Sequence, residues 1–152
     1  KVRYGLMLRE DGFAFDYVLI DCPPSLSLLT VNAMVAAHSV LVPLQAEFFA
    51  LEGLSQLMLT VREVRQSANP NLRIEGVLLT MYDSRNNLSQ QVEADARANL
   101  GDLVYKTIVP RNVRLSEAPS YALPVLAYDT MSRGAIAYRA LAHEILARHG
   151  GK

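Results

Sequence analysis

The sequence predicts an α/β fold, with helices on both faces of a mostly parallel sheet. Four strand-sized apolar runs alternate with helical stretches along the chain. Each run is apolar throughout, which is typical of parallel strands buried on both faces. The 152 residues are 51% hydrophobic and 20% charged, a composition that excludes a disordered tail. This length suits one domain, so we expect a single domain over residues 1–152.

The first half of the chain contains two predicted strands and two predicted helices. Phe15–Asp21 is rich in aromatic and β-branched residues, so it is expected to be a buried strand that the following prolines end. A helix is expected from Ser25, as its N-cap, to Ala37. Val40–Leu44 is a second apolar strand. Leu51–Gln66 has apolar residues at a spacing close to 3.6, which predicts an amphipathic helix.

The second half continues the alternation. Ile74–Met81 and Val104–Val109 are the third and fourth predicted strands, and the polar stretch Leu88–Leu100 between them predicts a helix. Leu123–Tyr128 is expected to be either a short strand or an extended connection. A final helix is expected from Ser132 to His149. Its inward-facing residues are predicted to be Ile136, Tyr138, Leu141, Ile145 and Leu146.

Charge, cysteine content and hydropathy exclude several classes of protein. Fifteen basic and fifteen acidic residues give a formal net charge of zero, so nucleic-acid binding would require a local patch. The single cysteine, Cys22, excludes an internal disulfide framework and a multi-cysteine zinc site. No apolar stretch approaches the roughly 20 residues of a membrane span. The chain starts at Lys1 rather than at a methionine, so we expect a piece of a longer protein.

Asp21 ends the first predicted strand, at the edge of a parallel sheet where ligands bind. A carboxylate there can hold Mg²⁺ directly or through water, as in the Walker B arrangement of nucleoside triphosphatases. An aspartate at a strand end is also a common turn or capping residue. The pattern alone leaves a metal site and a structural role open.

Four segments together resemble one family in the same order. They are DYVLIDCPPSLSLLTVNAM, VPLQAEFFALEGLSQL (42–57), EGVLLTMYDSRNNLSQQV (75–92) and VPRNVRLSEAPSYALPVLAYDTMSRGAIAYRALAHEI (109–145). They resemble the ParA/Soj-type partition ATPases, which belong to the deviant Walker A group of P-loop proteins. The resemblance implies a P-loop NTPase-like fold and a CbiA-like nucleotide-binding domain, of which this chain would be the C-terminal part.

The chain departs from that family at the phosphate-binding loop. No G-x-x-x-x-G-K-[ST] occurs, and Gly5, Gly12 and Gly53 are isolated glycines. That loop supplies the backbone N–H groups and the lysines that neutralise phosphate charge. The resemblance therefore implies that the whole protein is an ATPase, whereas this chain alone is expected to be inactive and to lack the N-terminal phosphate-loop portion.

The resemblance also implies roles for individual residues in binding ATP and Mg²⁺. Asp21 matches the Walker B acid, so it is expected to be catalytic and to organise Mg²⁺. The residues expected near adenine are Thr80, Met81, Pro110, Arg111 and Asn112. The residues expected at an ATP-dependent dimer interface that responds to the γ-phosphate are Gln45, Glu47 and Phe48. The alternatives are ordinary strand-to-helix turns and, for Glu47, a carboxylate that complements a helix dipole.

Arg85 and Arg114 are the residues that the resemblance implies for DNA binding. Guanidinium groups neutralise phosphates and release counterions, which binds DNA without regard to sequence. Arg111, and also Arg133 or Arg139, can add to such a patch. A lone surface arginine, in contrast, is usually only a solvated charge.

The function implied by the resemblance is chromosome or plasmid segregation in the cytoplasm, at the nucleoid. ATP and Mg²⁺ would drive formation of a homodimer that binds double-stranded DNA non-specifically, and a ParB-like partner would stimulate hydrolysis and release. No membrane partner is expected. Two alternatives stay open: a truncated, non-catalytic chain that binds DNA or a parent subunit, and a related ATPase that positions another cargo.

Overall fold

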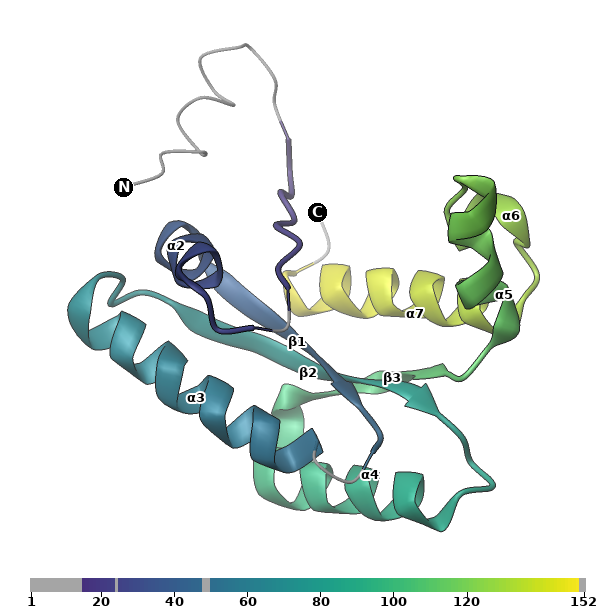
Figure 1. The fold of residues 1–152 in the computed structure, drawn as a ribbon, viewed down its shortest axis with the longest axis horizontal. Coiled ribbons are helices and arrows are strands. Elements are labelled where there is room, and N and C mark those ends of the chain that lie inside the picture. Colours follow the sequence, from purple (N-terminus) through teal and green to yellow (C-terminus); the bar gives the residue numbers. More distant parts are fainter. Residues whose placement is uncertain (1–14, 24, 48–49, 151–152) are drawn as a thin grey trace. The chain divides into compact units, whose positions relative to one another are not determined.

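The computed structural model describes residues 15–23, 25–47 and 50–150. Its strands are β1 (Ser39–Gln45), β2 (Arg73–Tyr82) and β3 (Val104–Pro110). Its α-helices are α2 (Leu28–Ala36), α3 (Ala50–Ser67), α4 (Asn87–Leu100), α5 (Val113–Glu117), α6 (Val125–Tyr128) and α7 (Arg133–Arg148). Two short 3₁₀ helices, η1 (Gly101–Leu103) and η2 (Ala118–Tyr121), complete the path (Figure 1).

The strands form one parallel sheet with the order β1-β2-β3, which confirms the predicted α/β class. β2 and β3 are paired at Val77↔Val104, Leu79↔Ile108 and Tyr82↔Pro110. The spacing changes between these pairs, so β3 is irregular around Tyr105–Thr107 and β2 is irregular around Thr80–Met81. Because the strands are parallel, β2 and β3 end at the same edge of the sheet.

The described residues fall into two compact units, and the boundary passes through β1, α3 and β2. The first contains residues up to 40 together with 53–75, and the second contains 41–52 together with everything from 76 onwards. Each unit has its own apolar core. The single domain over 1–152 stays a prediction.

In the first unit, α2 packs against α3. Its buried core consists of Met34, Val61, Val64 and Leu72. The side-chain amide of Asn69 donates to the carbonyls of Met34 (3.0 Å) and Ala37 (2.8 Å), which fixes the end of α2 to the turn after α3. The predicted 3.6-residue spacing of α3 is confirmed, since Leu54, Val61 and Val64 are its buried residues.

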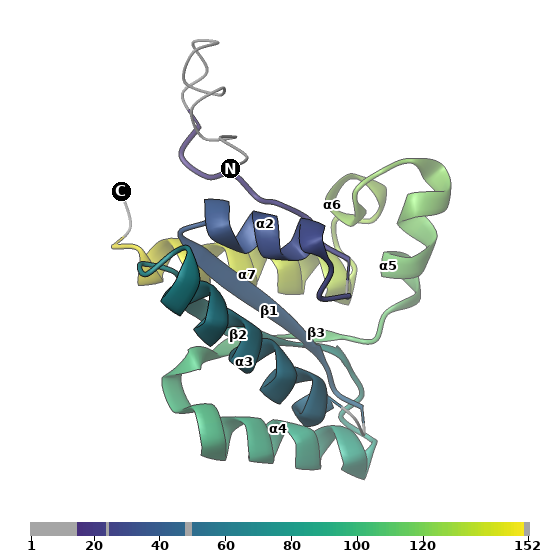
Figure 2. The same ribbon diagram turned by 60° about the vertical axis from the view of Figure 1, so that its left-hand side comes forward.

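In the second unit, α7 packs on β3, and α4 lies on the other side of that strand (Figures 1 and 2). The buried core consists of Leu78, Tyr105, Val109, Ala137 and Leu141. The segment α5–η2–α6 lies beyond the N-terminal end of α7 in both views. It connects the end of β3 to α7 and so borders the edge where β2 and β3 end.

The predicted first strand is wrong for the residues that the structure describes. Residues 17–23 have no regular secondary structure, and Leu19 is 89% exposed. A strand requires a ladder of hydrogen bonds to a neighbouring strand, and the three described strands pair only among themselves. The apolar pattern of Phe15–Asp21 shows that this segment is suited to burial, but not which strand it would pair with.

Two predictions about the C-terminal third are also wrong. Residues 125–128 form the helical turn α6 rather than a strand or an extended connection, because the Pro124 carbonyl accepts from the backbone of both Ala127 and Tyr128. On α7, Ile136, Tyr138 and Leu146 are exposed. The buried face of α7 consists instead of Gly134, Ala135, Ala137 and Leu141. Small residues let the helix approach its neighbours closely, so the larger apolar side chains point outwards.

Among the described residues, no helix is both long and apolar enough to span a lipid bilayer.

Candidate functional site

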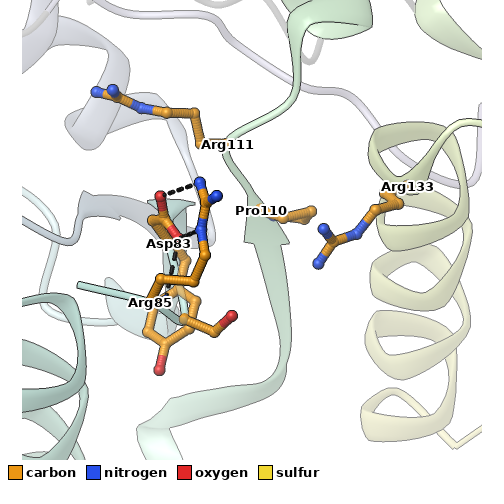
Figure 3. A pocket seen from close by; sticks show the side chains of 7 residues that line it. Asp83, Arg85, Pro110, Arg111 and Arg133 are labelled. Atoms are coloured by element: carbon orange, nitrogen blue, oxygen red, sulfur yellow. Dashed lines mark hydrogen bonds and ion pairs between the residues drawn. The ribbon is translucent and has the colours of Figure 1, made fainter. Parts of the chain in front are cut away.

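A pocket lies at the edge where β2 and β3 end (Figure 3). Its volume is about 310 Å³. It is lined by Tyr82, Asp83, Ser84, Arg85, Pro110, Arg111 and Arg133. Three arginines stand against one aspartate, so the lining has a formal charge of +2 although the whole chain has none. A concave surface of this sign favours an anionic ligand.

The irregular end of β2 directs residues into this pocket. Leu79 pairs with Ile108 and Tyr82 pairs with Pro110, so β2 has one residue more than β3 over this stretch. Met81 lies in the irregular part with φ of 53°, a left-handed conformation that costs a non-glycine residue roughly 1–2 kcal/mol. Bulges of this kind turn side chains towards binding sites. Here, the two residues after Met81 become part of the lining.

Asp83 and Arg85 form a two-point ion pair on one side of the pocket (Figure 3). Arg85 donates from Nε to Asp83 Oδ1 at 3.0 Å and from Nη2 to Oδ2 at 2.9 Å. The backbone N–H of Arg85 also donates to Oδ1 at 3.0 Å. These hydrogen bonds, with a smaller contribution from the charge of Arg111, lower the pKa of Asp83 to about 2. The carboxylate is therefore ionised at neutral pH.

Pro110 lies between Arg85 and Arg133 in the close view (Figure 3). The backbone N–H of Arg111 donates to the carbonyl of Tyr82 at 2.9 Å, which joins the two strand ends. The Arg111 side chain points away from Arg133, whereas the Arg133 side chain reaches from α7 towards Pro110. The apolar ring of Pro110 is thus flanked by two guanidinium groups.

Asn112 and Arg114 lie next to the pocket but do not line it. Asn112 is the N-cap of α5, and its side-chain oxygen accepts from the backbone N–H of Arg114 at 2.8 Å. Arg114 forms ion pairs with Glu117 at 2.8 Å and with Asp129 at 3.3 Å. The hydrogen bond to Glu117 is the main reason that the pKa of Arg114 is raised. The oxygen of Asn112 is therefore engaged in capping α5, while its NH₂ group donates to no residue among those that the structure describes.

The remaining residues predicted to contact adenine or a dimer partner are distributed around the strand ends. Thr80 is half-buried, and its carbonyl accepts from the backbone N–H of Ala46 at 3.0 Å. Gln45 and Glu47 are exposed at and after the end of β1. Phe48 lies outside the described residues.

Asp21 belongs to the first unit, whereas the pocket belongs to the second. Its side chain is exposed, in the irregular segment that precedes α2. In the described ranges, no group of three or more histidine, cysteine, aspartate or glutamate side chains is placed to hold a metal ion.

Sequence reasoning missed the pocket residues Tyr82, Asp83 and Ser84. One signal for Asp83 was available: a carboxylate two residues after the predicted strand Ile74–Met81 and two residues before an arginine assigned to DNA. Arg133 and Arg139 could not be told apart by sequence. The structure distinguishes them, because Arg133 lines the pocket while Arg139 donates hydrogen bonds to Thr130 and lies outside the lining.

Comparison with known proteins places the chain in a family. A family model described as an AAA domain matches residues 7–74. The chromosome partitioning protein ParA of Caulobacter vibrioides is 63% identical over 93% of this chain and 52% of its own length. The sporulation initiation inhibitor protein Soj of Bacillus subtilis is 57% identical over 97% of this chain and 58% of its own length. The chain belongs to the ParA/Soj family.

Solved structures related to this ParA/Soj chain have the same fold. A Mycobacterium smegmatis structure described as cobyrinic acid a,c-diamide synthase, with bound ADP and magnesium, matches with a TM-score of 0.74 and 38% identity. That match covers 99% of this chain and 53% of the other. The cell division ATPase MinD of Pyrococcus furiosus matches with a TM-score of 0.73 at 24% identity, over 93% of this chain and 55% of the other, and shows the fold alone.

The ParA/Soj chain spans about half the length of the curated relatives that it matches. The predicted family and the predicted P-loop NTPase-like α/β fold are confirmed.

Proposed function

We propose that this chain is part of a partition ATPase whose nucleotide-dependent homodimer binds double-stranded DNA through the arginines at the ends of β2 and β3. The observation that carries the proposal is the arginine-lined pocket in a chain that is 63% identical to a chromosome partitioning protein. A net charge of zero makes this gathering of arginines stand out from the rest of the chain.

The proposed nucleotide site consists of one residue for Mg²⁺ and a set of residues for adenine. Asp21 would organise Mg²⁺, which supplies charge neutralisation at the phosphates when bound. Adenine would lie near Pro110, Arg111 and Asn112, with Thr80 and Met81 at the neighbouring strand end. The chemistry of these residues fits a base, because the proline ring offers an apolar face and Asn112 retains a free amide NH₂. The related Mycobacterium structure holds ADP and magnesium.

The proposed DNA contacts are Arg85 and Arg114. Both side chains are at least half exposed, with exposed fractions of 88% and 51%. Both already form ion pairs with carboxylates of this chain, so a DNA phosphate would have to share or replace Asp83 at Arg85 and Glu117 at Arg114. Exposed ion pairs contribute little to stability, which makes such an exchange inexpensive.

Dimerisation and partner binding complete the proposal. Gln45, Glu47 and Phe48 would respond to the γ-phosphate at the dimer interface, and a ParB-like protein would stimulate hydrolysis. The exposure of Gln45 and Glu47 after the end of β1 is compatible with contact to a second subunit. The protein would act in the cytoplasm on nucleoid DNA, without a membrane partner.

The test is to combine Arg85→Glu and Arg114→Glu in the full-length protein. We expect duplex DNA binding in the presence of ATP to be abolished, because two cations become anions that repel phosphate. ATP binding, followed with a fluorescent nucleotide, is expected to be retained. A matched control is the pair Arg62→Glu and Arg65→Glu on α3, which makes the same change in charge at residues that do not line the pocket.

Unchanged DNA affinity and unchanged salt dependence in the Arg85/Arg114 variant would refute the DNA assignment. DNA binding that does not depend on nucleotide would favour the non-catalytic alternative. The unaltered protein could bind DNA in a nucleotide-dependent way and yet have no effect on chromosome or plasmid segregation. That result would favour a related ATPase that positions another cargo.

A further inference from the structure

Arg133 differs from the other arginines proposed for DNA. Arg85 and Arg114 are each held by a carboxylate, whereas Arg133 forms no ion pair within the described part of the chain. Its side chain is exposed and lines the pocket, reaching towards Pro110 from the side opposite Arg85 (Figure 3). Its guanidinium group is therefore available to a ligand without the loss of an existing ion pair.

The position of Arg133 in its helix is unfavourable in the absence of an anion. It is the first residue of α7, and no acidic residue occupies the first turn of that helix. A cation at a helix N-terminus is repelled by the partial positive charge there, whereas an anion is attracted. A bound phosphate would relieve this repulsion and would also pair with the guanidinium.

The start of α7 is held rigidly, so Arg133 projects from a fixed place. The next residue, Gly134, is buried, and a Cβ atom there would lie 2.6 Å from Cγ of Leu115 on α5. Ser132, the N-cap, accepts from the backbone N–H of Ala135 at 3.2 Å. Close packing and capping therefore fix the helix end beside the pocket.

We propose that Arg133 and Arg85 together bind one phosphate group of the DNA backbone at the part of the pocket that their guanidinium groups line, and that Asp83 is a built-in competitor for it. Asp83 occupies the Nε and Nη2 donors of Arg85, which form the two-point fork that a phosphate would also use. Arg133 supplies the second guanidinium group, and Asp83 limits how strongly Arg85 binds the phosphate. This inference rests on the proposed function, because it requires that the protein binds DNA.

The experiment compares two single variants of the full-length protein that should change DNA affinity in opposite directions. Arg133→Gln should weaken ATP-dependent binding to a mixed-sequence duplex by about tenfold, since a charge-assisted hydrogen bond is lost. The slope of log affinity against log salt should become less negative by about 1 in this variant. Asp83→Asn should strengthen binding, because the fork of Arg85 is released.

Two controls carry the same changes in charge outside the pocket. Arg62→Gln, on α3, matches Arg133→Gln, and Asp95→Asn, on α4, matches Asp83→Asn. Both controls should keep the DNA affinity of the unaltered protein to within about twofold, because neither residue lines the pocket. The thermal unfolding midpoint of Arg133→Gln should be no lower than that of the unaltered protein, which separates lost binding from lost folding.

Several outcomes would overturn the inference. If Arg133→Gln has the same DNA affinity as Arg62→Gln at every salt concentration, Arg133 is not a DNA contact. A loss of ATP affinity with unchanged DNA affinity in Arg133→Gln assigns the phosphate to the nucleotide instead. Weaker DNA binding by Asp83→Asn makes Asp83 a residue that positions Arg85, not a competitor. If the unaltered protein binds no duplex DNA, the proposed function fails as well; if DNA binding depends on Arg114 but not on Arg133, only this inference fails.

Discussion

At Gly76, β2 passes close to the ring of Tyr105 on the neighbouring strand. A Cβ atom at Gly76 would lie 2.5 Å from Cε2 of Tyr105 and 2.9 Å from the backbone carbonyl oxygen of Leu103. Tyr105 is fully buried, so its ring has no space into which to move. The glycine is therefore required by packing, because the carbonyl oxygen of Leu103 and the ring of Tyr105 occupy the space of a side chain.

Gly76→Ala is expected to lower the free energy of unfolding by roughly 1–3 kcal/mol, because overpacking a rigid site forces neighbouring atoms to shift. The midpoint of urea unfolding of the full-length protein measures this change. Gly53→Ala on α3 is the control, since a Cβ atom there meets nothing within 4 Å. It should raise stability by about 0.5–1 kcal/mol, as alanine favours a helix over glycine. A midpoint for Gly76→Ala at or above that of the unaltered protein would contradict the packing argument.

At the scale of single residues, the family resemblance pointed to several residues that line the pocket. Pro110, Arg111 and Arg85 come after the predicted third and fourth strands, and all three line the pocket. Asn112 also follows a strand, but its oxygen caps α5. Whether a polar residue faces a ligand or caps a helix depends on the direction of the next helix, which its own position in the sequence does not reveal.

At the scale of helices and strands, the side chain of Glu144 on α7 forms hydrogen bonds to the backbone of β3. Its carboxylate accepts from the backbone N–H groups of Lys106 at 2.8 Å and Thr107 at 2.9 Å, where the register of β3 is irregular. Arg148, one turn further along α7, donates to the same carboxylate at 3.2 Å. Burial raises the pKa of Glu144, but these hydrogen bonds outweigh it and hold the pKa below its ordinary value. The ionised carboxylate thus stabilises the fold.

The stability of the protein is therefore expected to fall on acidification partly through Glu144. A carboxyl whose pKa is lower in the folded state stabilises fully above its unfolded pKa of about 4.3 and loses that contribution as pH falls through the folded pKa. Glu144→Gln should be less stable than the unaltered protein at pH 7 and should lose less stability between about pH 5 and pH 3. Urea unfolding at several pH values measures both effects.

The control for this pH profile is Glu63→Gln on α3. Glu63 is exposed, and its side chain forms no ion pair within the ranges that the structure describes. The control should reproduce the profile of the unaltered protein. Identical profiles for Glu144→Gln and the unaltered protein would show that the Glu144 contacts do not contribute.

The helices and strands with a clear period or a long apolar run were predictable within a few residues. This holds for β1, β2, β3, α3, α4 and α7. The exposed segment 17–23 was not, because a strand is defined by its partners and not by its own residues. The buried face of α7 was not predictable. The sequence pattern favours burial of the large apolar residues, whereas close packing buries the small residues Gly134, Ala135 and Ala137.

Over the whole molecule, zero net charge coexists with a positively charged pocket. The residue counts give the net charge, whereas the fold reveals the charged pocket, because it brings Arg133 of α7 beside the ends of β2 and β3. The three arginines proposed for DNA come from the end of β2, from α5 and from α7, and all of these lie in the second unit.

If Arg85 and Arg133 share one phosphate and Arg114 neutralises another, log affinity should fall against log salt with a slope of about −1.8 per chain. Titration of a fluorescent duplex at several salt concentrations in the presence of ATP measures the slope. A slope near zero would contradict phosphate neutralisation, whereas a much steeper slope would require further cations. Substituting glutamate for chloride as the anion provides a control for anion binding by the protein itself.

The carboxylate of Glu144 has a further consequence for solubility. β3 is at one end of the described sheet, and an exposed sheet edge can recruit a strand from another molecule. At neutral pH, Glu144 occupies two backbone donors of this strand. Once protonated, the carboxyl holds them less tightly, and the strand becomes a template for self-association. The same contact that shapes the fold at pH 7 would then determine how readily the protein aggregates in acid.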